Sequence, residues 1–238
     1  MKIELPQGSF LTSAEPSAPV ILVAGGRPPA DGWLKQVARR YPVWAADRGI
    51  DACRSAAVTP KMLIGDADSG SSESWRWAES LGVPLVRHPV DKDLTDLQLS
   101  LQELAARRPG SEVLLTGALG RRFDHAYSNV FSLWEANLSG LRAIGLADEA
   151  EALFFLEGGQ FFHADLLESP VAISLLPLTD ECENVNSKGV RWPLYQALLK
   201  RDHPGGICNR LAEGSHSVDV FLNKGLLGVY FCWNENGL

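Results

Sequence analysis

Acidic residues recur in four short motifs along the first half of the chain, each where a predicted strand ends or a predicted helix begins. The motifs read AADRG (45–49), GDADS (65–69), KDLTD (92–96) and GALGRRFDH (117–125). Like charges at close range cannot all stay ionised unaided, so a cluster of their aspartates would need a cation. Oxygen ligands without Cys or clustered His favour magnesium or calcium, and magnesium usually binds through carboxylates and substrate phosphates together. The set predicts phosphate transfer on a nucleotide.

The second and third motifs each have two interpretations. Asp66 and Asp68 are two positions apart after an apolar strand, so in extended chain both face one side and form a candidate Mg²⁺ site. The alternative is a solvated turn, where Asp and Ser are common. Asp93 and Asp96 are three apart at a predicted helix start, so we expect them on one face of its first turn. Capping the helix and complementing its dipole is the alternative there, although it does not account for Lys92 beside them.

The fourth motif joins a predicted strand to a predicted helix. Its glycines allow the backbone to approach a phosphate, and Arg122 can hold phosphate oxygens in a forked geometry. Asp124 is either a ligand-contacting carboxylate or the N-cap of the helix, and His125 is either a ligand contact or a partly buried histidine. Gly25-Gly26 after the first strand is a weaker phosphate-loop candidate, because no Gly-Lys-Ser/Thr follows it.

Apolar runs and helical patterns alternate up to about residue 150. We predict strands at 20–24, 43–46, 62–64, 84–88, 113–116 and 141–146, and helices at 31–40, 72–81, from 92–96 onward, and at 124–137. Near-continuous apolar strands separated by helices indicate an α/β fold with a doubly covered parallel sheet. Ligands of such sheets bind beyond the carboxyl ends of the strands, which groups Asp47, Asp66 and Asp68.

The pattern becomes β-rich after about residue 150. Strands are predicted at 151–164, 170–178, 185–194, 217–224 and 226–233, with glycine turns between them, which favours a small β-sandwich or barrel. Residues 1–18 are predicted to be an irregular leading segment. Trp192 lies in this half; core packing is favoured over stacking on a flat cationic ligand.

Composition limits the function classes. The 238 residues are 45% hydrophobic, and the formal net charge of −7 argues against a broad basic surface for nucleic acid. No apolar stretch reaches membrane-spanning length, and the first residues lack the apolar core of a signal peptide. The four cysteines are far apart, which argues against structural zinc and favours a reduced cytoplasmic protein.

The four motifs, in this order, resemble the thiamine pyrophosphokinase family. The segments SLLPL (174–178) and KGVRWPL (188–194) also resemble strands of that family's vitamin-binding domain. The resemblance implies an α/β ATP-binding catalytic domain over residues 1–148 and a smaller β-sandwich thiamine-binding domain over residues 149–238. It implies a homodimer with active sites between subunits. The implied reaction moves the terminal diphosphate of ATP to the hydroxyethyl oxygen of thiamine and releases AMP.

The resemblance also implies residue roles, with Mg²⁺ as cofactor and ATP as co-substrate. The implied magnesium ligands, which also act in catalysis, are Asp66, Asp68 and Asp93. The other implied catalytic residues are Asp96, Arg122 and Asp124. The implied substrate-binding residues are Asp47, Lys92, Thr95, Arg122, His125, Cys208 and Asn209.

Three positions depart from the family pattern. Arg48 and Arg121 stand where the family has glycine, and Cys208-Asn209 stands where it has Ser-Asn. Because that serine is expected close to the aminopyrimidine ring of the vitamin, a related diphosphokinase acting on a pterin alcohol stays open as an alternative. A non-catalytic sensor of thiamine diphosphate or nucleotide is the other alternative, and retention of all six aspartates argues against it. Nucleic-acid and membrane partners are not expected.

Overall fold

A computed structural model describes residues 2–12, 19–66, 70–88, 93–120 and 122–234 of the chain. Contacts divide the chain into two units. Residues 17–148 form the first, here called the α/β unit. Residues 1–16 join residues 149–238 in the second, here called the β-rich unit. The amino-terminal residues therefore belong to the β-rich unit, whereas the sequence had placed them in the α/β domain.

The α/β unit is built on six parallel strands in the order β8-β7-β3-β4-β5-β6. Its strands are β3 (Val20–Val23), β4 (Val43–Ala46), β5 (Leu63–Gly65), β6 (Leu85–Arg87), β7 (Glu112–Thr116) and β8 (Arg142–Ala147). Its helices are α1 (Asp31–Ala38), α2 (Gly49–Ser55), α3 (Ser72–Ser80), α4 (Asp96–Arg107), α5 (Phe123–Glu135) and the 3₁₀ turn η1 (Ala136–Ser139).

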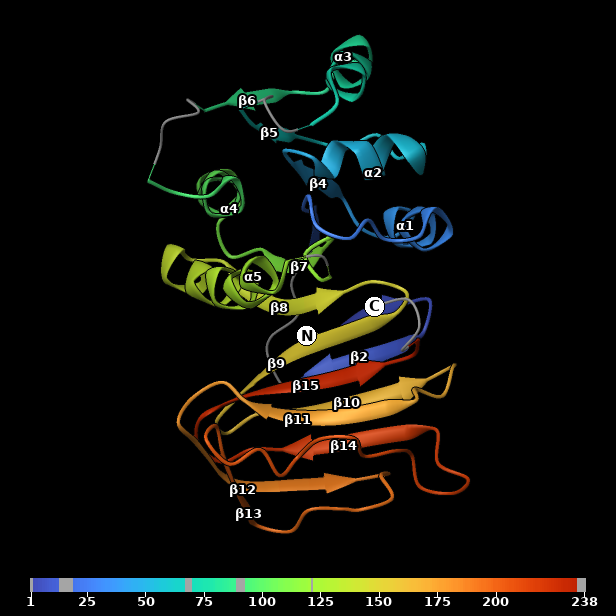
Figure 1. The fold of residues 1–238 in the computed structure, drawn as a ribbon, viewed down its shortest axis with the longest axis vertical. Coiled ribbons are helices and arrows are strands. Elements are labelled where there is room, and N and C mark those ends of the chain that lie inside the picture. The colour runs from blue at the N-terminus through green and yellow to red at the C-terminus, as the bar shows by residue number, and fades with distance from the viewer. Residues whose placement is uncertain (1, 13–18, 67–69, 89–92, 121, 235–238) are drawn as a thin grey trace. The chain divides into compact units, whose positions relative to one another are not determined.

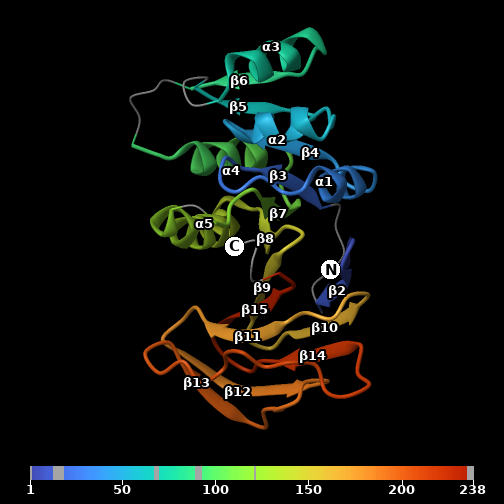
Figure 2. The ribbon, with the colours of Figure 1, turned by 45° about the vertical axis from the view of Figure 1, so that its right-hand side comes forward.

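Helices cover both faces of this sheet. Figures 1 and 2 show α1, α2 and α3 on one face and α4 and α5 on the other. Every residue of β3, β4 and β7 is buried, because a strand covered on both faces has no solvent side. The prediction of a doubly covered parallel sheet is confirmed.

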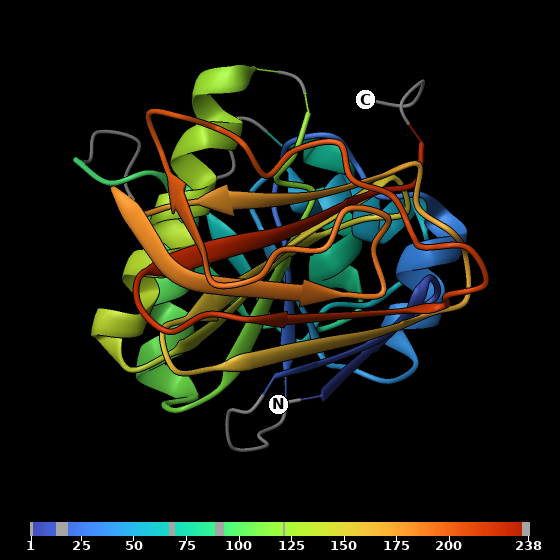
Figure 3. The same ribbon diagram turned by 90° about the horizontal axis from the view of Figure 1, so that it is seen from below.

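The β-rich unit contains two antiparallel sheets. One has the strand order β1-β2-β10-β14-β12-β13, and the other contains β11-β15-β9. Its strands are β1 (Lys2–Leu5), β2 (Gly8–Thr12), β9 (Glu151–Glu157), β10 (Phe161–Leu166), β11 (Ala172–Pro177), β12 (Glu181–Lys188), β13 (Ala197–Lys200), β14 (Ser217–Phe221) and β15 (Leu226–Cys232). Figure 3 draws the later strands of this unit in orange and red.

Phenylalanines from both sheets form the core of the β-rich unit. The Phe10 ring of β2 stacks on the Phe154 ring of β9, with centroids 4.4 Å apart. Phe162 of β10 and Phe231 of β15 lie 6.1 Å apart in the same cluster, and all four side chains are fully buried. Interdigitation of rings from the two sheets is the packing of a β-sandwich, one of the two architectures that the sequence left open.

The structure differs from the prediction at five elements. Residues 2–12 form the hairpin β1–β2, and β2 pairs with β10, so this segment is not irregular. The strand predicted over 151–164 is two strands, β9 and β10. The strand predicted over 185–194 begins earlier and ends at Lys188. Helix α2 and strand β13 were not predicted.

No helix among the described residues is both long and apolar enough to cross a membrane.

Candidate active site

A cavity of about 540 Å³ opens in the α/β unit where the parallel strands end, and we call it the carboxyl-edge cavity. This volume is in the range of small-molecule sites. Loops after β3 and β4, the start of α4 and the β7–α5 connection form its wall. Its polar and glycine lining residues are Gly25, Gly26, Asp47, Arg48, Thr95, Asp96, Gly120, Arg122, Asp124, His125, Ser128 and Asn129.

Asp47 and Asp66 follow neighbouring strands at this edge. Asp47 comes directly after β4 with a left-handed backbone (φ 45°), and the residue is only 7% exposed. A Cβ placed on Gly65 at the end of β5 would lie 3.1 Å from the Asp47 Cβ, so glycine permits the two strand ends to approach closely. Asp66 follows Gly65 and is half-buried. The structure thus brings these two carboxylate-bearing positions together, while Asp68 lies outside the described residues.

The third motif is placed differently from our expectation. Thr95 is the N-cap of α4, and it forms a capping box in which its Oγ1 accepts from the Gln98 N–H while Gln98 Oε1 accepts from the Thr95 N–H. Asp96 is therefore in the first turn of α4 and Asp93 precedes the helix. The prediction that these aspartates share one face of the first turn is wrong. Asp96 and Thr95 line the cavity, whereas exposed Asp93 does not, and Lys92 lies outside the described residues.

Arg122 and Asp124 form an exposed ion pair at the mouth of the cavity. Arg122 Nη2 donates to Asp124 Oδ2 at 2.5 Å and its Nε donates to Oδ1 at 3.1 Å, which is a bidentate geometry. The hydrogen bond from Arg122 holds the pKa of Asp124 below its usual value. Helix α5 begins at Phe123 with Arg122 as N-cap, so the interpretation of Asp124 as N-cap is wrong. His125 is exposed and lines the cavity, which also excludes a buried histidine.

Backbone hydrogen bonds join the loop after β3 to the loop after β7, which leads to Arg122 and Asp124. The Gly26 N–H donates to the Gly117 carbonyl at 2.5 Å, and the Arg27 N–H donates to Leu119 at 3.0 Å. The Arg27 guanidinium also contacts the buried Asp148 carboxylate at 2.6 Å. Because these two backbone N–H groups already have acceptors, the Gly25-Gly26 loop shapes the wall and does not present them to a phosphate.

Two lining residues of α5 were missed from the sequence. Ser128 and Asn129 line the cavity, and Asn129 Nδ2 donates to the Ala118 carbonyl at 2.9 Å, which fixes the β7–α5 connection. They stand three and four positions after His125, so helical spacing from that residue is the signal that would have found them.

Oxygen atoms supply the acidic donor set at this edge, which is the chemistry that magnesium prefers. Among the described residues, no group of three or more His, Cys, Asp or Glu side chains is placed to hold a metal ion. The predicted trio of Asp66, Asp68 and Asp93 includes one position outside those residues. Magnesium therefore stays a prediction.

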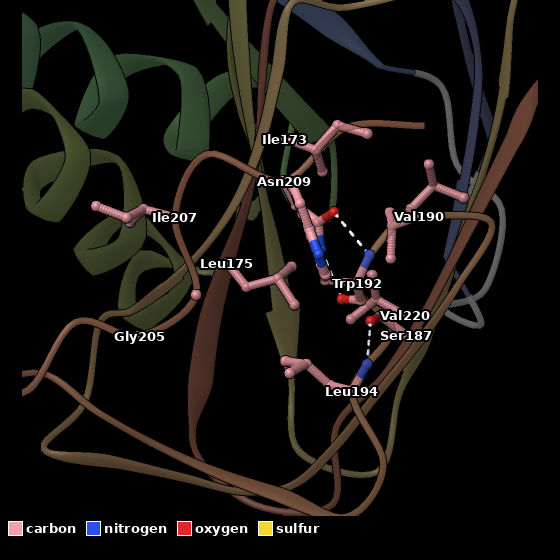
Figure 4. A pocket seen from close by; sticks show the side chains of 12 residues that line it. Ile173, Leu175, Ser187, Val190, Trp192, Leu194, Gly205, Ile207, Asn209 and Val220 are labelled. Atoms are coloured by element: carbon pink, nitrogen blue, oxygen red, sulfur yellow. Dashed lines mark hydrogen bonds between the residues drawn. The ribbon is translucent and has the colours of Figure 1, made fainter. Parts of the chain in front are cut away.

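A second cavity, of about 230 Å³, lies within the β-rich unit (Figure 4). Aliphatic side chains such as Ile173, Leu175 and Val220 form most of its wall. Ser187 is the buried hydroxyl there, and its Oγ accepts from the Leu194 N–H at 2.9 Å. A largely apolar wall with its hydroxyl already engaged suits a flat, weakly polar group.

The Asn209 side chain forms hydrogen bonds with the backbone of Trp192 at one edge of this second cavity. Its Nδ2 donates to the Trp192 carbonyl at 2.7 Å and its Oδ1 accepts from the Trp192 N–H at 3.2 Å, as Figure 4 shows. Trp192 is 55% exposed, with the Arg191 guanidinium 4.9 Å from its ring centre, so the core-packing prediction for it is wrong. Cys208 is exposed with φ 60°, and its N–H donates to Ser174 Oγ at 3.1 Å.

The fold and cavities define a class: an α/β unit with a nucleotide-sized cavity beyond its parallel strands, in one chain with a β-sandwich. Residues 35–144 match the family model "Thiamin pyrophosphokinase, catalytic domain" and residues 166–227 match "Thiamin pyrophosphokinase, vitamin B1 binding domain". Together these matches span well over half of the chain. The chain belongs to the thiamine pyrophosphokinase family.

Individual relatives agree with this assignment. Thiamine pyrophosphokinase 1 of Oryza sativa subsp. japonica is 30% identical over 69% of this chain, and the match spans only 64% of the rice protein's own length. Thiamine pyrophosphokinase of Bacillus subtilis is 25% identical over 87% of this chain and 94% of its own. A crystal structure of thiamine pyrophosphokinase from Bacillus subtilis shares the fold, with a TM-score of 0.78 at 21% identity over 91% of this chain and 99% of that one.

Proposed function

We propose that the chain is a thiamine pyrophosphokinase that transfers diphosphate from ATP to thiamine, giving thiamine diphosphate and AMP. The observation that carries the proposal is the composition of the carboxyl-edge cavity. Three of the four acidic motifs contribute residues to its lining, and Asp66 of the remaining one follows the neighbouring strand. Neither the pterin-alcohol diphosphokinase nor the sensor has support in the family matches.

ATP occupies the carboxyl-edge cavity in this proposal. Arg48 and Arg122 line it from opposite loops and supply cations for phosphate oxygens. Asp66 and Asp68, with Asp93, are the residues that would hold magnesium, and the bound ion would neutralise charge on the phosphates. Thiamine is assigned to the β-rich unit, where Trp192 and Asn209 line the second cavity and Cys208 is adjacent in sequence.

The reaction is an in-line displacement. The hydroxyethyl oxygen of thiamine forms a bond to the β-phosphorus, the bond from that phosphorus to the oxygen bridging the α-phosphorus breaks, and AMP leaves. The hydroxyl proton passes to a carboxylate, and Asp96 is the candidate for this role among the residues that the structure describes. Asp96 lies in the first turn of α4 and lines the cavity. Orientation of the hydroxyl is expected to be its larger contribution, because the transition state of phosphoryl transfer is loose.

A homodimer in the cytoplasm completes the proposal. Exposed apolar side chains give each unit a surface that a second copy would cover: Phe123 is 80% exposed on α5 beside Tyr127, and Tyr195 is 74% exposed in the β-rich unit. No disulfide joins the four cysteines, all of which lie among the described residues, and this suits a reducing compartment. Light scattering of the purified protein would give twice the chain mass for the dimer and the single chain mass if this part is wrong.

AMP formation with Mg-ATP, measured with and without thiamine, tests the function. Thiamine-dependent AMP matched by an equal amount of thiamine diphosphate is the expected result. Asp66→Asn and Asp93→Asn are each expected to lower kcat at least about 100-fold while the protein remains folded, because each removes a predicted metal ligand. Asp180→Asn removes an exposed carboxylate on the β-rich unit and serves as the matched control. Folded protein that forms no AMP with thiamine would refute the proposal.

A further inference from the structure

An open groove of about 610 Å³, distinct from the two cavities described above, lies at the end of the parallel sheet where β4 begins. We call it the amino-edge groove. It is lined by the last turn of α1, by the start of β4 and by the loop that follows α2. Four cationic side chains converge on it, from Lys35, Arg39, Arg40 and Lys61. No carboxylate is among its lining residues. In a chain whose formal net charge is −7, this is a local reversal of sign.

Neutralisation by neighbouring acids does not account for three of these cations. Within the part of the chain that the structure describes, no carboxylate oxygen lies within 4.0 Å of the side-chain nitrogens of Lys35, Arg39 or Lys61. All three residues are exposed. Their charges therefore add to one another at the groove, and cations held close together attract a multivalent anion more strongly than isolated ones do.

The helix dipole accounts for only part of the cluster. Lys35 is in the last turn of α1 and Arg39 is its C-cap, where positive charge complements the carboxyl end of a helix. Lys61 has no such role, because it lies in the connection before β5 and its N–H donates to the Val43 carbonyl at 2.7 Å. This hydrogen bond fixes the backbone of Lys61 beside the start of β4.

The floor of the groove is apolar, unlike its rim. Val43 and Val58 are buried beneath the cations, at 3% and 8% exposure. Arg39 offers a forked donor that matches phosphate oxygens, and an apolar floor suits a flat ring or a sugar face. The volume is in the range of sites for molecules of nucleotide size.

We propose that the amino-edge groove binds a phosphorylated small molecule of nucleotide size, at a site separate from the carboxyl-edge cavity. The two sites lie at opposite ends of β4, since Val43 lines the groove while Ala46 and Asp47 line the cavity. At a rise of about 3.3 Å per residue, four strand residues separate them by roughly 10–13 Å. The proposal goes beyond the proposed function and does not depend on it.

Calorimetric titration with ADP, at low ionic strength and without divalent cations, tests this site. Wild-type protein is expected to show one binding event at the amino-edge groove, and the proposed function adds a second one at the carboxyl-edge cavity. Arg39→Gln/Lys61→Gln should weaken one event at least about tenfold, because each arginine or lysine contact to a phosphate is charge-assisted. Arg122→Gln should weaken the other event and leave the groove event intact. The matched control, Arg76→Gln/Arg107→Gln, removes two positive charges from exposed positions on α3 and α4 that line neither site.

Three outcomes would overturn the proposal. The first is ADP binding by Arg39→Gln/Lys61→Gln with both events unchanged. The second is an equal loss in Arg76→Gln/Arg107→Gln, since the effect would then reflect net charge alone. The third is a groove that ignores ADP but binds a short single-stranded oligonucleotide. Loss of thiamine-dependent AMP formation in any of these proteins bears on the proposed function and leaves this test unaffected.

Discussion

Gly117→Ala is expected to destabilise the protein by more than its backbone conformation alone explains. Gly117 has φ +66°, and an L-residue in the left-handed region costs about 1–2 kcal/mol. A Cβ there would also lie 2.4 Å from the Ala24 carbonyl oxygen, a backbone atom, whereas carbon atoms in contact prefer about 3.5–4.0 Å. Relief requires the loops after β3 and β7 to separate, which weakens the hydrogen bond from Gly26 to Gly117 by about 1 kcal/mol.

The expected total is about 2–3 kcal/mol, measured as the free energy of unfolding in urea. Gly110→Ala is the matched control, because Gly110 has φ +76° but nothing within 4 Å of its added Cβ. It should lose only about 1–2 kcal/mol. The two loops form part of the carboxyl-edge cavity, so the KM for ATP should rise in Gly117→Ala and stay unchanged in Gly110→Ala. Equal losses of stability in both variants would show that contact between the loops after β3 and β7 adds nothing to the cost of Gly117→Ala.

Three further changes test single groups. Arg48→Gln should raise the KM for ATP about tenfold with little change in kcat, and an unchanged KM would remove Arg48 from phosphate binding. Cys208→Ser should preserve or improve the kcat/KM for thiamine; a large loss would show that Cys208 does not replace the family serine. The Asp219 carboxylate, 2.7 Å from His163 Nδ1, raises the pKa of His163. This stabilisation is full below the unfolded pKa of about 6.5 and is lost as pH rises through the raised value. His163→Gln should therefore lower Tm more at pH 5.5 than at pH 9, and equal losses at both pH values would contradict it.

The strands of the α/β unit could be predicted because sequence and burial carry the same signal there. β4 consists of four apolar residues, all buried, and Asp47 follows directly, so both the strand and its functional end are visible in the sequence. Helix α2 escaped prediction for a local reason: it begins at Gly49 and is only seven residues long, so helical periodicity cannot develop.

The misplacement of Asp93 has a local cause that was readable. Thr95 and Gln98 form the S/T-x-x-E/Q pattern of a capping box, which fixes the helix start at Asp96 and leaves Asp93 outside. No local sequence pattern of this kind indicates that Trp192 is exposed. Its position depends on Asn209, 17 residues later, and contacts at that separation are set by tertiary structure alone.

The hairpin β1–β2 has a consequence for the order in which the chain folds during synthesis. β2 emerges from the ribosome early, yet its pairing partner β10 and the stacking partner of Phe10, Phe154, follow roughly 150 residues later. At 5–20 residues per second this is a delay of about 7–30 s, during which the whole α/β unit emerges. β2 pairs with β1 along one edge, but its other edge stays unpaired through that interval, and unpaired strand edges promote aggregation. Truncation of the first dozen residues would remove that exposed segment but also leave β10 without a neighbour on one side, so this sheet needs strands from residues 2–12 and from residues 161–221.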